Sequence, residues 1–246
     1  MSVLSSDAVI EPDWRVPANV RALCTTRRGG VSEGPMGTFN VGMHVGDAPD
    51  AVARNRSLLR SRLPAEPVWM EQVHGNDVID AATVDGTPVA DAAVSRTRSV
   101  VCCVMTADCL PVLLADDAGS VVAVAHAGWR GLAHGVIEAT VNRMQVAPGR
   151  VVAYLGPAIS RAAYEVGAEL FDLFVRNDSA AAEAFTSKGS GKYWCDLYCL
   201  AKRQLIRLGV TAIYGGRHCT YQEPERFFSF RRDGRTGRMA SLVWLA

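Results

Sequence analysis

Short apolar segments dominate the hydrophobic pattern of the chain, and most of them are bounded by Gly, Asp or Pro. Segments of this kind that are rich in β-branched residues are typical of buried strands. The pattern predicts strands over residues 20–26, 68–73, 100–105, 111–115, 121–125, 151–155, 211–214, 227–230 and 241–244.

Four other segments carry apolar residues at helical spacing. In the last of them Leu197, Leu200, Leu205 and Leu208 share one face, and Gly209 follows as a stop signal. We therefore expect helices over residues 49–62, 132–144, 168–175 and 196–208. Because strands and helices are intermixed without regular alternation, the pattern predicts an α/β protein with a mixed sheet or two packed sheets, rather than a Rossmann or barrel fold.

The composition is that of an ordinary globular protein. Of 246 residues, 49% are hydrophobic and 21% are charged, and the formal net charge is +1. This balance excludes a largely disordered chain and indicates no general surface for nucleic acids or anionic membranes. No apolar run reaches the roughly 18 to 20 residues of a membrane span, and no basic residue precedes Arg15 as in a signal peptide. We expect a cytoplasmic protein, a monomer or weak homodimer, with no nucleic-acid or membrane partner.

The seven cysteines are an odd number and are spread along the chain, which indicates free thiols rather than a disulfide framework. Cys102 and Cys103 are adjacent in a predicted strand, so we expect them to face opposite sides as small buried residues. Cys195 and Cys199 are interpreted as core, because no second pair at zinc-finger spacing accompanies them. Cys109 differs, because it follows a strand in a polar turn.

Three residues that can bind a metal lie where predicted strands end: His74, Cys109 and His126. Two histidines and a cysteine suit Zn²⁺, and three protein ligands leave a fourth position open for water or substrate, as in catalytic zinc sites. Their spacing matches no local zinc motif, so unrelated packing roles stay open as the alternative. Asp108 is a candidate to orient a ligand or a water, or alternatively a turn residue.

The segment after His126 is a candidate anion site. Gly128 and Gly131 would let the backbone approach a ligand, a helix is expected to begin nearby, and Arg130 would add a fork of donors. A surface arginine after a tight turn is the alternative interpretation. The chain contains neither G-x-G-x-x-G nor G-x-x-x-x-G-K-[ST], so the usual dinucleotide and nucleoside triphosphate loops are absent.

Three motifs carry these candidates: QVHG at 72–75, TADCLPV at 106–112 and HAGWRG at 126–131. Together they resemble the YfiH family, also called the laccase-domain or polyphenol-oxidase family. Further similar blocks are TTRRGGVS at 25–32, NVGMHVGD at 40–47, FFSFRRDG at 227–234 and TGRMA at 236–240. The resemblance runs from about residue 20 to the C-terminus, so we expect an N-terminal lead-in over residues 1–19 and a single catalytic domain over residues 20–246.

The resemblance implies a single α/β domain with mixed β-sheets sandwiched between helices, the fold of the catalytic domain of bacterial deamidating toxins of the CNF type. It also implies that His74, Cys109 and His126 bind one metal, usually zinc, at the bottom of a pocket. The implied activities are phosphorolysis of adenosine, inosine and methylthioadenosine, with a nucleoside and phosphate as partners, and deamination of adenosine. Some bacterial members are instead linked to peptidoglycan editing.

The laccase name implies more copper than this chain can hold. A multicopper oxidase needs a blue-copper site and a three-copper cluster built mostly from histidines, often as His-x-His pairs. The chain has five histidines and no such pair. A His₂Cys set could hold one blue-type copper with a weak methionine ligand, so copper is the alternative metal, but laccase activity is not expected.

Positions in the resembling motifs suggest substrate contacts. We take Arg28 and Arg130 as candidate phosphate contacts and Asn40 and His44 as candidate ribose or base contacts; a loop-stabilising role is the alternative for His44. Among the aromatic residues near the C-terminus, Phe228 is the candidate to stack on a purine base.

Phe227 and Phe230 are expected in the core, and Asp108 is the candidate proton shuttle in deamination. Two other function classes stay open. In the first, Cys109 is a thiolate nucleophile with His74 or His126 as its base, which would make the protein a metal-independent amide hydrolase. In the second, the protein binds a metal or nucleoside without catalysis. Metal content and turnover distinguish the three.

Overall fold

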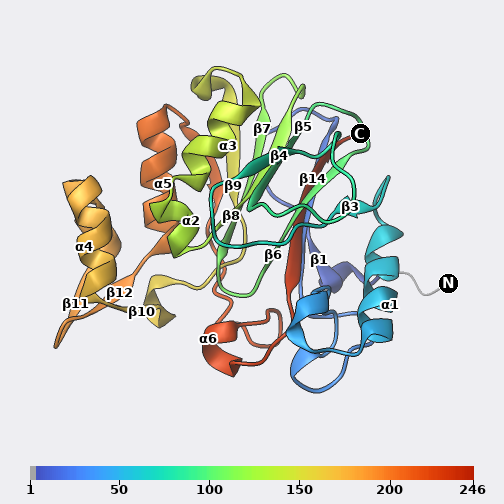
Figure 1. The fold of residues 1–246 in the computed structure, drawn as a ribbon, viewed down its shortest axis with the longest axis horizontal. Helices are drawn as coiled ribbons and strands as arrows, with labels where there is room; N and C mark the ends of the chain where they lie inside the picture. Colours follow the sequence, from blue (N-terminus) through green and yellow to red (C-terminus); the bar gives the residue numbers. More distant parts are fainter. Residues whose placement is uncertain (1–3) are drawn as a thin grey trace.

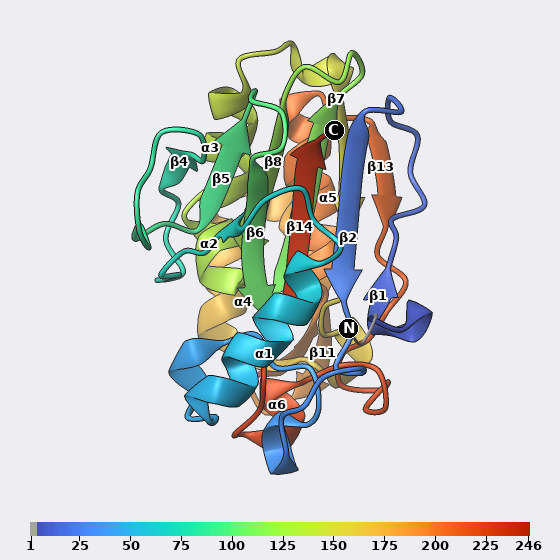
Figure 2. The same ribbon diagram turned by 90° about the vertical axis from the view of Figure 1, so that its right-hand side faces the viewer.

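Two β-sheets packed face to face form the centre of the computed structural model, which describes residues 4–246 (Figures 1 and 2). The five-stranded sheet has, in spatial order, β1 (Val9–Ile10), β2 (Val20–Thr25), β14 (Met239–Leu245), β6 (Val101–Thr106) and β3 (Pro67–Val68). The six-stranded sheet has β13 (Ala212–Gly215), β9 (Val151–Leu155), β7 (Leu110–Asp116), β8 (Val122–Ala127), β5 (Ala92–Ser95) and β4 (Val78–Asp80). Both sheets are mixed, as expected from the irregular order of the predicted elements.

The facing sides of the two sheets form one buried layer. Cys102, Val104 and Val243 of the five-stranded sheet belong to the same apolar cluster as Leu113 and Val124 of the six-stranded sheet. Strands β6, β7 and β8 are buried at every position, because helices cover the outer face of each sheet. Full burial on both faces explains why these strands are nearly continuous apolar runs in the sequence.

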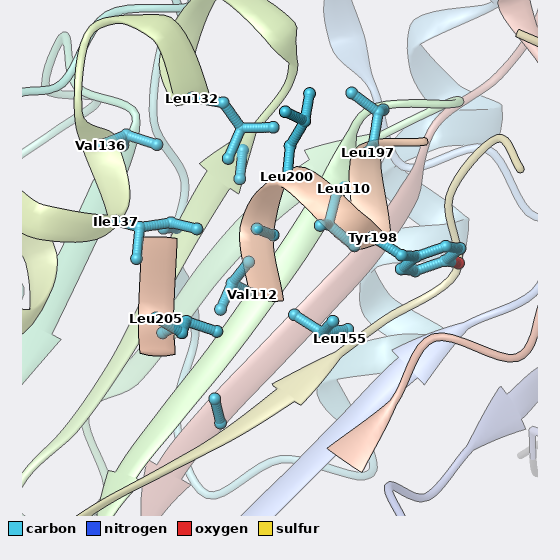
Figure 3. Close-up of a cluster of buried hydrophobic side chains, with 14 of the residues drawn as sticks. Leu110, Val112, Leu132, Val136, Ile137, Leu155, Leu197, Tyr198, Leu200 and Leu205 are labelled. Carbon is cyan, nitrogen blue, oxygen red and sulfur yellow. The ribbon is translucent and has the colours of Figure 1, made fainter. Parts of the chain in front are cut away.

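Helices α2 (Trp129–Ala133), α3 (Val136–Met144) and α5 (Leu197–Leu208) cover the six-stranded sheet, and their apolar faces pack on it (Figure 3). Helix α1 (Pro49–Arg60) covers the five-stranded sheet on the opposite side of the molecule, where Leu59 packs with Leu23 and Leu242 (Figure 1). The expected arrangement, mixed sheets sandwiched between helices, is confirmed.

A smaller unit lies beside this core. The strands β10 (Glu165–Gly167), β12 (Lys192–Cys195) and β11 (Phe185–Gly189) form an antiparallel sheet next to helix α4 (Ala168–Asn177), at one side of the molecule (Figure 1). Helix α6 (Phe230–Asp233) is a single turn before the last strand. Within the described residues, no helix is both long and apolar enough to cross a membrane.

Most predicted elements are present, and three corrections follow from local backbone geometry. The strand expected over residues 68–73 is limited to β3, and the one expected over 227–230 is absent, since that segment leads into α6. The helix expected over 132–144 is two helices, α2 and α3, because Gly135 between them has φ +79°. The strands β1, β4, β5 and β10–β12 lie outside the predicted set.

The burial predicted for the cysteines is largely confirmed. Cys102 and Cys103 are both buried and belong to clusters on opposite faces of β6. Cys195 is fully buried at the end of β12, whereas Cys199 on α5 is only partly buried, since it lies in the first turn of α5 beside Glu183. No disulfide joins the described cysteines.

Candidate metal centre

The ligand atoms of His74, Cys109 and His126 all lie within 4.8 Å of one another. Cys109 is in the turn between β6 and β7, where the chain crosses from the five-stranded to the six-stranded sheet. His126 is the second-last residue of β8, and His74 lies in the loop after β3. The two imidazole rings meet edge to face with centroids 4.7 Å apart, and the Cys109 Sγ is 3.9 Å from His74 Nε2. The three expected residues therefore do converge.

Gly128 makes room for this convergence. The β7–β8 ladder pairs Leu110 with Ala127, which sets Cys109 beside Gly128. A Cβ at Gly128 would lie only 2.7 Å from the Cys109 Sγ and 3.5 Å from His74 Cδ2. No side chain fits there without displacing the thiol, so glycine is required by close approach.

His74 is not at the end of a strand, which corrects our expectation. It has φ +61°, and its loop is held by Asp91 at the start of β5. The Asp91 carboxylate accepts hydrogen bonds from the backbone amides of Val73 (3.1 Å), His74 (2.9 Å) and Gly75 (2.7 Å).

The same carboxylate also contacts His126. Its Oδ1 is 2.7 Å from His126 Nδ1, and the backbone amide of His126 donates to the Asp91 carbonyl at 2.7 Å. Asp91 is completely buried. Asp91 was not among the predicted site residues, although one signal was available: it is an acidic residue inside the apolar run 89–94. A buried carboxylate needs partners of this kind.

The electrostatics of the site favour a thiolate. Burial raises the pKa of Cys109, but the attraction of His126 and hydrogen bonds from His126 and His74 outweigh it and lower the pKa to about 6. Burial lowers the pKa of His126, yet the negative charge of Cys109 and the hydrogen bond to Asp91 raise it to about 9. A deprotonated sulfur is the form that binds a metal or acts as a nucleophile.

This donor set fits zinc. Two ligand atoms at about 2.0 to 2.3 Å from a tetrahedral zinc are roughly 3.5 Å apart, close to the 3.9 Å between Cys109 and His74. His74 and Cys109 are each partly exposed, whereas His126 is buried. Among residues 4–246 this is the one group of three or more His, Cys, Asp or Glu side chains arranged for a metal.

Asp108 lies next to Cys109 but points its carboxylate elsewhere. Oδ1 accepts a hydrogen bond from the Thr220 hydroxyl and Oδ2 accepts one from the backbone amide of Arg231, each at 2.6 Å. Asp108 therefore fastens the C-terminal segment to the cysteine turn. Its φ of +98° is unusual for a residue other than glycine.

Asn40 and Arg28, two of the candidate substrate contacts, are bonded to other groups of the protein. Asn40 is buried and fully bonded: its Oδ1 accepts from the amides of Gly42 and Arg238, and its Nδ2 donates to the Gly42 carbonyl and to Asp47. Arg28 donates to the Glu225 carbonyl and forms an ion pair with Asp7 at 3.4 Å. Both side chains thus have protein partners.

His44 and Arg130 are exposed. The neighbouring protein nevertheless removes part of the water around the His44 ring, and this desolvation, followed by the positive charges of Arg238 and Arg56, lowers the pKa of His44. Arg130 lies over the Trp129 ring, 4.4 Å from its centroid, in the first turn of the five-residue helix α2.

Arg238 was not among the predicted contacts. Burial lowers the pKa of its guanidinium, while the negative charges of Cys109 and Asp108 raise it, so this cation lies near the site.

The aromatic positions differ from expectation. Phe227 is fully buried as predicted, but so is Phe228, which packs with Phe227 and Met239 beneath the Arg27 guanidinium. Phe230 was expected in the core and is instead 58% exposed. The reason is that residues 227–230 are not a strand, so the alternation of buried and exposed positions does not apply. Phe228 has no exposed face on which a base could stack.

Fold and site together define an α/β protein with one candidate His₂Cys metal centre at the end of two packed sheets. The family model described as "Multi-copper polyphenol oxidoreductase laccase" matches residues 21–246. The chain therefore belongs to this family, the YfiH or laccase-domain family that its motifs resemble.

Relatives and solved structures agree with this membership. The purine nucleoside phosphorylase YfiH of Escherichia coli (strain K12) is 50% identical over 243 residues, which are 96% of this chain and 98% of that protein. The purine nucleoside phosphorylase PA4543 of Pseudomonas aeruginosa is 50% identical over 97% of this chain and 99% of its own. The crystal structure of the Neisseria meningitidis protein NMB0706 is similar with a TM-score of 0.94 at 54% identity, covering 97% of this chain and 99% of that one.

Proposed function

We propose that this protein is a zinc-dependent purine nucleoside phosphorylase. The observation that carries the proposal is the convergence of His74, Cys109 and His126 into a partly exposed set of three zinc-type ligands. The names of the E. coli and P. aeruginosa relatives support the reaction class, because both are described as purine nucleoside phosphorylases at 50% identity over nearly the whole chain. Adenosine, inosine and methylthioadenosine are the proposed substrates.

Phosphorolysis joins a phosphate oxygen to the anomeric carbon of the ribose while the bond from that carbon to the purine nitrogen breaks. The purine leaves with the electron pair and must be stabilised and protonated. Electrostatic stabilisation of developing charge is the main contribution that a preorganised site can make. A zinc held by His74, Cys109 and His126 would supply a Lewis acid to the site.

The remaining roles belong to cations and aromatic residues around the ligands. We assign phosphate binding to Arg130 and Arg238. Arg130 is exposed just after Gly128, and Arg238 is a cation near Cys109. Phe230 replaces Phe228 as the candidate to stack on the base, since it is exposed and precedes Arg231, which contacts Asp108. Alanine at Arg130 or Arg238 should raise the KM for phosphate; unchanged KM and kcat in both variants would remove these assignments.

One observation favours a second candidate function. The low pKa of Cys109 and the Asp91–His126–Cys109 arrangement also match an activated thiolate nucleophile. In that case the protein would be a metal-independent amide hydrolase, and the muropeptide amides of peptidoglycan editing would be its substrates.

Zinc analysis and product chromatography on wild type and Cys109→Ala test these proposals together. We expect one zinc per wild-type chain, adenine formed from adenosine only when phosphate is present, and loss of both zinc and turnover in the variant. Inosine formed without phosphate would indicate deamination at the same site instead.

A metal-free wild type whose activity is abolished by alkylation of Cys109 would support the hydrolase. A zinc-bearing protein inert on all three nucleosides would contradict the phosphorylase proposal.

A further inference from the structure

One buried carboxylate links two of the three metal-binding residues. Asp91 has no exposed surface, and its two oxygens contact the loop of His74 and the ring of His126. We propose that Asp91 is the positioning residue of the metal centre, which holds both histidines in the orientation that the metal requires. The inference rests on the proposed function for the presence of zinc at this site, and it does not depend on the nucleoside reaction.

Asp91 holds the backbone around His74. Three successive amides, those of Val73, His74 and Gly75, converge on the Asp91 carboxylate. Successive N–H groups that point to one centre form an anion-binding nest. His74 has φ +61°, and a residue other than glycine keeps such a conformation only where its surroundings enforce it. Asp91 supplies that enforcement, so the direction of the His74 side chain depends on it.

Asp91 also contacts the ring of His126. Its Nδ1 is 2.7 Å from Asp91 Oδ1, so the proton on Nδ1 is donated to the carboxylate and Nε2 is the ring nitrogen available to the metal, which would take the place of the proton on Nε2. Histidine ligands of metals are usually fixed in this way by a carboxylate or carbonyl on the other ring nitrogen. The backbone amide of His126 also donates to the Asp91 carbonyl at 2.7 Å. Both the ring and the main chain of His126 are thus set by the same residue.

The chain offers a matched control for a merely structural role. Asp116 at the end of β7 is also fully buried, and its carboxylate accepts hydrogen bonds from the amides of Ser120 and Val121 and from the Ser120 hydroxyl. It therefore organises a turn as Asp91 does, but it contacts no metal-binding residue. Removing the negative charge at either position should destabilise the fold, but only the change at Asp91 should weaken metal binding.

The test compares zinc affinity in wild type, Asp91→Asn and Asp116→Asn by competition with a chelator. We expect Asp91→Asn to bind zinc about 10- to 100-fold more weakly, the range for partners that orient a ligand, and Asp116→Asn to keep wild-type affinity. Wild-type affinity in Asp91→Asn, or an equal loss in Asp116→Asn, would overturn the proposal. Because no substrate is involved, a zinc-binding protein that fails to cleave nucleosides would contradict the proposed function alone.

A second measurement needs no variant, so it tests the proposal even if Asp91→Asn does not fold. With only five histidines in the chain, long-range ¹H–¹⁵N correlation spectra of the zinc-loaded wild type can assign each ring. We expect His126 to carry its proton on Nδ1 with Nε2 bound to zinc. A proton on Nε2, or zinc on Nδ1, would show that Asp91 does not orient this ligand.

Discussion

The groups around Cys109 outweigh the effect of burial on the pKa of its thiol, whereas those around Cys24, Cys102 and Cys103 do not. Burial raises the pKa of Cys24 to about 12 and moves those of Cys102 and Cys103 still higher. At Cys109, attraction to His126 reverses that effect of burial. The difference follows from neighbours alone, since all four are cysteines inside or next to strands of the same two sheets.

Alkylation of the metal-free protein should reflect this difference. Because the pKa of Cys109 is lowered to about 6, its thiolate is present above that pH and is lost as the pH falls through it. We expect iodoacetamide to modify Cys109 at neutral pH with a rate that falls to half near pH 6, as measured by peptide mass spectrometry. In His126→Asn the midpoint should move up towards about 8.5, the value of a free cysteine. The same midpoint in both proteins would contradict this origin of the shift.

Gly128→Ala tests the space around the same sulfur. The backbone of Gly128 has φ −64° and ψ 169°, which alanine adopts without strain, so the whole effect must come from the Cβ placed 2.7 Å from Cys109 Sγ. We expect weaker zinc binding and a stability loss of about 1–3 kcal/mol, as for other overpacked sites. Chelator competition and urea unfolding measure the two effects.

Gly149→Ala is the matched control, because nothing lies within 4 Å of a Cβ there; it should leave zinc affinity unchanged. If Gly128→Ala binds zinc like the wild type, the close approach of Gly128 is not required.

The contrast between Cys109 and Asp91 shows what sequence can predict about individual residues. Cys109, His74 and His126 are predictable because their side chains can bind metal and because they lie in recognisable motifs. Asp91 acts mainly by accepting hydrogen bonds from the backbone amides of a loop 16 to 18 positions away. Every residue type except proline has such an amide, so the sequence of the loop does not indicate this contact. Asp108 shows the converse: adjacency to a ligand suggested a role at the metal, while its carboxylate is committed to Thr220 and Arg231.

At the scale of elements, helix α1 anchors the glycine-rich loop that precedes it. Asn55 is buried on this helix; its Oδ1 accepts a hydrogen bond from the Val31 amide, and its Nδ2 donates to Ser32, Thr38 and Asn40. A single side chain therefore fixes most of the loop to the outer layer of the molecule. A buried polar group with this many partners is costly to remove, because the partners are left unsatisfied.

Asn55→Ala should therefore loosen the loop. We expect a loss of about 1–3 kcal/mol in the free energy of unfolding, together with faster amide hydrogen exchange over residues 30–40. Arg54→Ala, an exposed neighbour on the same helix, should stay within about 0.5 kcal/mol of the wild type. Unchanged exchange in the loop of Asn55→Ala would show that other contacts hold it.

Strands that are buried on both faces could be predicted from the sequence, whereas the other elements were less predictable. Strands β6, β7 and β8 are buried throughout and almost entirely apolar, and their positions follow from that pattern. The strand expected to lead into His74 stops at Val68. Beyond it Glu71 makes only an isolated bridge with Val89, and the amides of residues 73–75 bond to the Asp91 side chain rather than to a neighbouring strand. Gly135 has a left-handed backbone and so divides α2 from α3. The spacing of apolar residues does not reveal this break, since both helices pack on the same sheet.

At the scale of the molecule, the candidate metal centre lies where the two sheets are connected. The turn that carries Cys109 joins β6 of the five-stranded sheet to β7 of the six-stranded sheet, and His126 lies on β8. The resemblance implied the layers, but pairing between strands distant in sequence, such as β14 with β2 and β6, could not be derived from the hydrophobic pattern. A ligand shared by this turn, β8 and the His74 loop should therefore stabilise the molecule as a whole.

Thermal unfolding at buffered zinc concentrations measures that stabilisation. A ligand that binds only the folded state at 1,000 times its Kd adds about 4 kcal/mol, which for a chain of this size raises Tm by roughly 10 °C. We expect this rise in wild type and little or none in Cys109→Ala. Cys199→Ala, which removes a partly exposed thiol on α5 outside the centre, should keep the full rise. Equal Tm values for wild type with zinc and with a chelator would mean that the three residues do not form a zinc site in the folded protein, because a ligand that binds the native state must stabilise it.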